Sequence, residues 1–133
     1  VAGVTDERSV AVSAEADHAV VPSLYEGCSL PAHEAMGSGT PLVATDGGAR
    51  PEVTGADGAT VLQCAAGDAD ALAATIARGL DDPELRARVG AAGRARVLDR
   101  WTWKKCAEMT VEQYREVLAM PANVEKLQAN GRV

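Results

Sequence analysis

The chain has 133 residues, a formal net charge of −6 at pH 7, 47% hydrophobic residues and no phenylalanine. This length predicts one domain, and the acidic balance argues against nucleic acid or an anionic membrane surface as the main partner. The sequence contains no signal-peptide pattern and no apolar run long enough to span a bilayer. Three widely separated cysteines, Cys28, Cys64 and Cys106, indicate a reduced cytoplasmic protein without a clustered metal site.

The first half of the chain predicts a strand–loop–helix–strand unit. A helix is expected over about residues 7–16, and the apolar run at 18–22 predicts a buried strand that stops at Ser23. Ser29 is a good N-cap and Pro31 suits a first turn, so a second helix should run from about residue 30 to the glycine stop at 37–39. Residues 40–45 predict the next strand. The loop then lies at the carboxyl end of the first strand, where open α/β sheets bind ligands.

The second half predicts further helices and one more strand. We expect a glycine turn and a short helical piece at 46–53, a strand at 59–64, and a helix over 69–80 capped by Asp68. Asp82 and Pro83 should start another helix, which Gly90 and Gly93 are expected to weaken or break. Thr102 should cap a final helix to about residue 120. The predicted fold class is α/β, with a Rossmann-like parallel sheet flanked by helices.

Two carboxylates frame the loop. Glu26 and Glu34 have seven residues between them, and Glu34 sits about one turn into the expected helix. The free amides of Gly27, Cys28, Ser29 and Leu30 would point out from a helix N-terminus and suit a phosphate, while the carboxylates could accept from sugar hydroxyls. From spacing alone, a loop glycine with two solvated glutamates is the other interpretation.

A long ordered stretch resembles a known family. The matching residues are Pro22-Ser23, Glu26-Gly27, Leu30-Pro31, Glu34-Ala35-Met36, Gly39-Thr40-Pro41, Val43-Ala44-Thr45, Gly47-Gly48 and Pro51-Glu52. This pattern is similar to the Glu-x7-Glu signature of retaining, nucleotide-sugar-dependent glycosyltransferases of the group 1 family, which have the GT-B fold. The resemblance runs from about residue 3 to about residue 118.

The resemblance implies roles for the loop residues. Glu34 would bind the ribose hydroxyls of the donor nucleotide, and Glu26 would lie beside the donor sugar as the candidate catalytic residue. Amides from Gly27 to Leu30 would contact the sugar and the diphosphate, and a UDP- or GDP-sugar would be a substrate rather than a cofactor. No protein-bound metal is expected, because basic side chains neutralise the diphosphate in this family. Many members carry an aromatic residue and then Gly where this chain has Cys28 and Ser29, which affects the fit of the donor sugar.

The resemblance also implies that parts of the enzyme are absent from this chain. Residues 1–120 would form part of the C-terminal nucleotide-sugar-binding domain, followed by a polar tail at 121–133. The N-terminal acceptor domain and the Arg/Lys pair that grips the diphosphate have no counterpart here, so we expect the isolated chain to be inactive. An unpaired edge of the sheet and the last helix are the candidate surfaces for self-association.

Other interpretations stay open at this point. A receiver-like signalling domain would need a phosphoacceptor aspartate, for which Asp46 is the only strand-end candidate, and a purely structural fragment would do nothing alone. Arginines at 86, 88, 94, 96 and 100 predict a solvated helix face or, alternatively, a site for an anionic acceptor or lipid headgroup. His33 invites an acid–base role, but nothing at motif spacing pairs with it, which favours a histidine at the helix surface or core edge.

Overall fold

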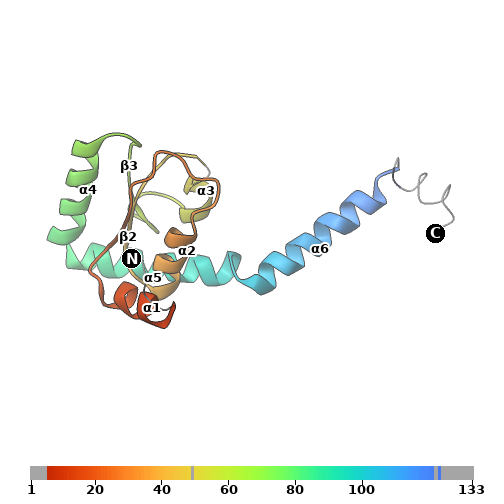
Figure 1. Ribbon diagram of the computed structural model, residues 1–133, viewed down its shortest axis with the longest axis horizontal. Helices are drawn as coiled ribbons and strands as arrows, with labels where there is room; N and C mark the ends of the chain where they lie inside the picture. The colour runs from red at the N-terminus through yellow and green to blue at the C-terminus, as the bar shows by residue number, and fades with distance from the viewer. Residues whose placement is uncertain (1–5, 49, 122, 124–133) are drawn as a thin grey trace. The chain divides into compact units, whose positions relative to one another are not determined.

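The computed structural model describes residues 6–48, 50–121 and 123 (Figure 1). The chain divides into two units, Val1–Leu98 and Asp99–Val133, which are treated separately below. The elements are α1 (Asp6–Glu15), β1 (Ala19–Val21), α2 (Leu30–Ser38), β2 (Leu42–Thr45), α3 (Arg50–Thr54), β3 (Leu62–Cys64), α4 (Ala69–Asp81), α5 (Pro83–Arg100) and α6 (Trp103–Ala119).

The sheet has three parallel strands in the order β1-β2-β3. Val43 in β2 pairs with Val20 on one side and with Leu62 on the other. Helix α2 connects β1 to β2, and α3 connects β2 to β3, so the predicted strand–helix–strand unit is confirmed. Because all the connections are parallel crossovers, the carboxyl ends of the strands meet at one edge of the sheet.

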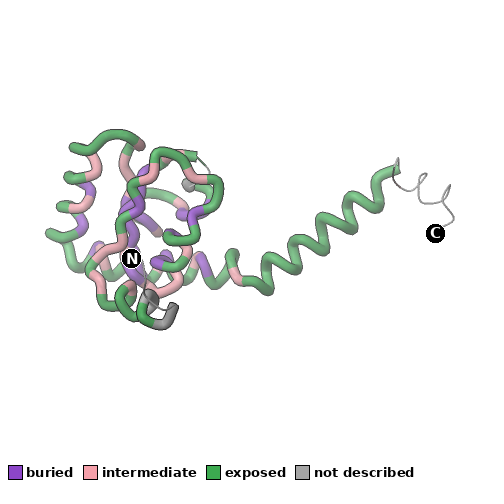
Figure 2. The backbone as a smooth tube through the Cα atoms, viewed as in Figure 1, coloured by how far each residue is buried: buried purple, intermediate pink, exposed green. Residues whose placement is uncertain are grey.

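Apolar side chains cover both faces of the central strand, as in most parallel sheets. The prediction of a buried first strand is wrong at Val20, which is 40% exposed. One core lies between the sheet and α2 and is formed by Val21, Ala32, Ala35, Met36, Leu42, Ala44, Val61 and Val97. The other core, against α4 and α5, is formed by Val43, Leu62, Leu85 and Val89, with Leu72 and Ile76 packed on it. Every residue of β2 is buried, so the central strand runs through the middle of the molecule's buried region (Figure 2).

The predicted helix starts at Asp68 and Asp82 are confirmed. Asp68 is the N-cap of α4, and its carboxylate accepts from the amide of Ala71 at 2.8 Å. Asp82 precedes Pro83, and its carboxylate accepts from the amide of Leu85 at 2.8 Å. Each side chain satisfies a main-chain donor that the first turn of a helix leaves unpaired.

Of the two expectations for Gly90 and Gly93, that they weaken or break the fifth helix, the break is wrong, because α5 is continuous from Pro83 to Arg100. Both glycines are buried where α5 passes close to main-chain atoms of other segments. A Cβ at Gly90 would lie 2.4 Å from the carbonyl oxygen of Gly39, and one at Gly93 would lie 3.1 Å from that of Thr60. The low helix propensity of glycine is therefore accompanied by a close approach, which leaves no room for a Cβ at Gly90 and only a tight fit for one at Gly93.

Three arginines of α5 donate hydrogen bonds to carbonyls near the carboxyl ends of three other helices. The bonds run from Arg86 to Gly79 and Leu80 of α4, from Arg94 to Gly37 of α2, and from Arg96 to Glu52 and Val53 of α3. Cationic donors at these positions satisfy carbonyls that lack a partner within their own helix. Their positive charge also interacts favourably with the negative end of each helix dipole. The arginine run therefore has structural contacts that the sequence did not predict, although Arg94 is exposed.

The second unit contains α6, which begins after Thr102 as predicted. Thr102 accepts from the amide of Lys105 at 3.2 Å, and no residue of α6 is buried. Most of the predicted polar tail, residues 122 and 124–133, lies outside the described residues. Among the helices that the structure describes, none has the length and apolar character needed to cross a membrane.

The contact between Gly90 and the carbonyl of Gly39 gives the first prediction. Replacing Gly90 with Ala should lower the free energy of unfolding by about 1–3 kcal/mol, because the added Cβ would overlap main-chain atoms. Gly37→Ala is the matched control, since its Cβ would meet only Val97 Cγ1 at 3.9 Å, and it should raise the free energy by about 0.5–1 kcal/mol. Urea unfolding of the two variants measures both effects, and equal effects would contradict the packing described here.

His18 sits at the start of β1 with its ring buried. Neither ring nitrogen has a hydrogen-bond partner among the described residues, and the ring lies so close to Gly79 that a Cβ there would overlap Nε2. Burial, and then the nearby Arg86 guanidinium, lower the pKa of His18 from 6.5, while Asp17 acts in the opposite direction. Protonation of the folded state is therefore unfavourable at this position.

A pH dependence of stability follows from this lowered pKa. Above about pH 6.5 His18 is neutral in both the folded and unfolded states, and its contribution to stability is fully present. As the pH falls, the unfolded state takes up the proton first, so the free energy of unfolding should decrease until the folded state is protonated too. Unfolding measured between pH 5.5 and 7 should show this slope in wild type and in His33→Gln, but not in His18→Leu. A slope that survives in His18→Leu would contradict the assignment.

Candidate functional site: the loop between β1 and α2

The loop that the sequence singled out lies at the carboxyl end of β1. Strand β1 ends at Val21, and α2 begins at Leu30 with Ser29 in an extended N-cap conformation and Pro31 in its first turn. The loop is therefore short, and it delivers the amino end of α2 to the edge of the sheet where the parallel strands end. This is the place where open α/β sheets usually bind their ligands.

The amides at the start of α2 have no protein acceptor in the described part of the chain. No hydrogen bond is donated by the backbone N–H of Gly27, Cys28, Ser29 or Leu30 to another described residue. Gly27, Cys28 and Leu30 are also exposed. Unpaired amides at the positive end of a helix dipole form an environment that favours an anion such as a phosphate.

Glu26 is fixed within this loop from two sides. Its carboxylate oxygen Oε1 accepts from the hydroxyl of Ser23 at 2.8 Å. Its main chain forms an isolated parallel bridge with Gly48, which has φ of +74° and lies so close that a Cβ would be 2.3 Å from the carbonyl oxygen of Glu26. Only glycine fits at position 48, for both steric and conformational reasons. Glu26 is half-buried as a result.

Glu34 lies on α2, one turn after the helix begins, and it is exposed. Its main-chain carbonyl accepts from Ser38 Oγ at 2.9 Å, but its carboxylate makes no hydrogen bond or ion pair with another described residue. No interaction links the carboxylates of Glu26 and Glu34 in the described chain. The loop thus holds Glu26 in place, whereas the side chain of Glu34 is available to a ligand.

Ser29 and His33 are bonded differently from what a simple cap would predict. Ser29 is 1% exposed, and although it occupies the N-cap position, its hydroxyl makes no capping bond and has no partner among the described atoms. The carbonyl of Ser29 instead accepts from the amide of His33 at 3.1 Å and from His33 Nδ1 at 2.8 Å. This bond gives His33 a local structural role at the start of α2.

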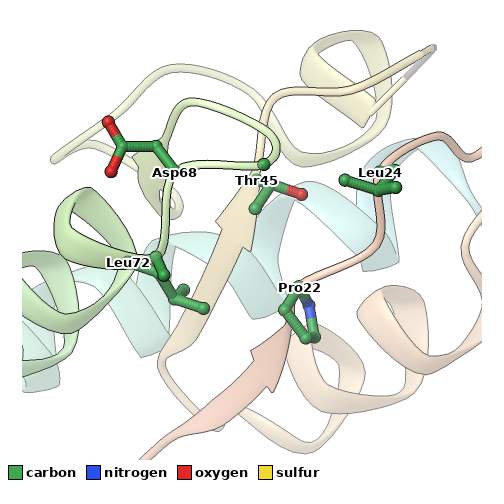
Figure 3. Close-up of a pocket in the computed structure, with 7 residues that line it drawn as sticks. Pro22, Leu24, Thr45, Asp68 and Leu72 are labelled. Carbon is green, nitrogen blue, oxygen red and sulfur yellow. The ribbon is translucent and has the colours of Figure 1, made fainter.

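A cavity of about 190 Å³ lies at the same edge of the sheet but does not include these residues. Figure 3 shows Pro22 and Leu24 on the loop, Thr45 at the end of β2 and Leu72 on α4 around it, with Asp68 nearby. None of the residues at 26–30 or 34 lines it. The cavity is small and largely apolar, so the chemistry of the site rests on the loop and the start of α2 rather than on this hollow.

Three residues that sequence reasoning did not assign to the site support the loop. Ser23 and Gly48 contact Glu26 directly, and Thr45 Oγ1 donates to the carbonyl of Ser23 at 2.5 Å. A serine three residues before a glutamate is a local signal that could have indicated the Ser23 contact. The contacts of Gly48 and Thr45 depend on how β2 lies beside β1, which residue spacing does not reveal.

Asp46, the candidate phosphoacceptor of the receiver-like alternative, has a structural role. Asp46 Oδ1 accepts from the amide of Ala66 at 3.0 Å, and its own amide donates to the carbonyl of Cys64 at 3.0 Å. No group of three or more His, Cys, Asp or Glu side chains that could hold a metal ion occurs among the described residues. The acidic cluster that a receiver domain needs is therefore not found in the described chain.

Comparison with known proteins identifies the family. The model for glycosyl transferases group 1 matches residues 2–96. The chain is 45% identical over 120 residues to the MMP alpha-(1->4)-mannosyltransferase of Mycolicibacterium hassiacum, and the match covers 90% of this chain and 29% of that relative. The chain therefore spans less than a third of the length of this relative.

Solved structures agree with the sequence match. Sucrose-phosphate synthase from Thermosynechococcus elongatus has a TM-score of 0.76 and 36% identity, over 88% of this chain and 29% of that one. The C-terminal domain of the group 1 family glycosyl transferase LpcC from Francisella tularensis has a TM-score of 0.68 and 25% identity, over 77% of this chain and 53% of that one. The chain belongs to the group 1 glycosyl transferases, and its parallel sheet with flanking helices is the α/β arrangement of GT-B enzymes.

Proposed function

We propose that this chain is the donor-binding part of a retaining glycosyltransferase and holds a nucleoside-diphosphate sugar. One observation carries the proposal: the leading amides of α2 lie at the carboxyl edge of a parallel sheet and have no acceptor among the described residues. These amides would donate to the diphosphate, whose negative charge the helix dipole also favours. The family membership supports the proposal, because the relatives' names describe glycosyl transfer.

The two glutamates would recognise opposite ends of the donor. The exposed carboxylate of Glu34 would accept from both hydroxyls of the ribose, a geometry that suits two carboxylate oxygens. Glu26, which is half-buried and held by Ser23, would lie beside the sugar as the candidate catalytic group. Gly27, Cys28, Ser29 and Leu30 would contribute main-chain amides to the substrate. No metal or cofactor has a role in this proposal.

The rest of the active site would come from beyond this chain. The match covers 29% of the mannosyltransferase relative, so an acceptor domain and basic groups for the diphosphate would be supplied by the remainder of a longer protein. We therefore propose that residues 1–120 are part of the C-terminal domain and that the chain alone transfers no sugar. No disulfide joins Cys28, Cys64 and Cys106 among the described residues, which is compatible with the cytoplasmic location that the sequence predicts.

Self-association of the isolated chain is also proposed. The sequence predicts an edge of the sheet as one candidate surface for this association. Helix α6 separately exposes apolar side chains, including Met109, Tyr114 and Leu118. An open strand edge and an uncovered apolar helix both promote association between copies.

Binding of nucleotides tests the proposed function. Calorimetric titration with UDP and with GDP should give weak binding, on the order of millimolar, because under this proposal the basic groups for the diphosphate would lie outside this chain. Glu34→Ala should weaken the binding about tenfold or more, since it removes charge-assisted hydrogen bonds to the ribose. Glu84→Ala is the matched control, because Glu84 is exposed at the start of α5.

The three possible results of this titration support or refute different parts of the proposal. Binding of one nucleotide that is lost in Glu34→Ala and kept in Glu84→Ala would support it. Equal affinity in all three proteins would refute the assignment of Glu34. Turnover of a nucleotide sugar by the purified chain would instead show that the expected inactivity is wrong.

A further inference from the structure

Two separate hydrogen bonds of Ser23, one through its main chain and one through its side chain, link the central strand to the carboxylate of Glu26. Thr45, the last residue of β2, is 2% exposed, and its hydroxyl donates to the carbonyl of Ser23 at 2.5 Å. The hydroxyl of Ser23 then donates to Glu26 Oε1 at 2.8 Å. Ser23 is therefore bonded both to a buried residue of the central strand and to a carboxylate at the edge of the sheet.

The main chain of Glu26 is held by a contact that does not involve Ser23 or Thr45. Its bridge to Gly48 fixes the backbone on the side of the loop that follows β2. The Ser23 bond fixes the far end of the same side chain. A glutamate has three side-chain torsions, so two attachments at opposite ends leave it few of the conformations that a free glutamate samples.

The described residues bond only one oxygen of this carboxylate. Oε1 accepts from Ser23, whereas Oε2 has no hydrogen-bond partner among the described residues. An ionised carboxylate accepts through both oxygens, so Oε2 remains available to a hydroxyl of a ligand. The carboxylate of Glu34 differs, because it is exposed and has no side-chain partner in the described chain.

We propose that Ser23 is a positioning residue, which holds Oε1 of Glu26 so that Oε2 faces the sugar of the bound donor. This inference rests on the proposed function and assigns the orientation of the sugar to Ser23 and Glu26 rather than to Glu34. Ordering Glu26 before binding removes an entropic cost that the ligand would otherwise meet. Thr45 supports the role by fixing the carbonyl of Ser23.

A purely structural role for Ser23 is the competing explanation, since a serine hydroxyl often bonds to a nearby residue in a turn. The two explanations differ in which part of the donor they affect. Positioning of Glu26 concerns the sugar alone, whereas loosening of the whole loop would also disturb the amides at 27–30. Nucleotides with and without a sugar therefore separate them.

The binding experiment compares UDP-glucose with UDP and GDP-mannose with GDP, using the chain and three variants. In Ser23→Ala the affinity for the preferred nucleotide sugar should fall about three- to tenfold, the loss of one hydrogen bond to a charged group. The affinity for the nucleoside diphosphate should stay within about twofold. Ser23→Thr keeps a hydroxyl and should restore sugar binding. Ser38→Ala, which removes a hydroxyl bonded to the Glu34 carbonyl, is the matched control and should change neither affinity.

If Ser23→Ala lowered the affinity for the nucleoside diphosphate and for the nucleotide sugar by the same factor, the positioning role would be overturned. It would also be overturned if the gain in affinity that the sugar provides were unchanged in Ser23→Ala. A wild type that binds the nucleotide in a Glu34-dependent way but gains nothing from the sugar would also overturn it, while the proposed function would stand. Absence of any nucleotide binding would overturn both.

A second measurement needs no ligand. Thermal unfolding of Ser23→Ala, Glu26→Ala and the double variant forms a double-mutant cycle. The shifts in melting temperature should be non-additive, because each single change removes the same hydrogen bond. Additive shifts would show that Ser23 does not hold Glu26 in solution, and they would overturn the proposal whatever the binding data give.

Discussion

Helix α2 is held at its carboxyl end by α5, and this fixes where its amino end lies. Arg94 donates to the carbonyl of Gly37 in the last turn of α2, and Gly90 lets α5 approach the carbonyl of Gly39 directly after it. Ala32, Ala35 and Met36 pack the same helix on the sheet. Since a helix is rigid over nine residues, these contacts determine the direction of the leading amides at the other end.

The candidate site combines this fixed helix with a loop that is fixed separately. Gly48 holds the main chain of Glu26, and Ser23 holds its carboxylate. Among the described residues, the amides at the start of α2 and the carboxylate of Glu34 have no partner, so the groups that would bind the proposed sugar nucleotide lie in one segment. The apolar cavity at the same edge is lined mainly by side chains without hydrogen-bonding groups, with Thr45 and Asp68 as the polar ones. The chemistry of this segment agrees with the family to which the chain belongs.

Local signals predicted the elements well, and long-range contacts explain what they missed. Asp68, Asp82 and Thr102 cap the helices that they were expected to start, because a cap involves residues three apart. Gly90 appeared to be a helix breaker, since its packing against Gly39 is invisible in the sequence. The partners of the α5 arginines are hidden for the same reason. Within the site, the loop and the unpaired amides followed from the motif, whereas the support from Gly48 and Thr45 depends on the neighbouring strand.

The central claim is that the amino end of α2 binds the diphosphate of the donor, and amide chemical shifts test it most directly. In ¹H–¹⁵N NMR spectra of the chain titrated with UDP or GDP, the largest changes should occur at the amides of Gly27, Cys28, Ser29 and Leu30. The nucleotide-free amides there have no acceptor among the described residues, so a phosphate would change their hydrogen bonding most. Largest changes around Gly67 and Leu72 in the cavity, with the amides at 27–30 unmoved, would contradict the account.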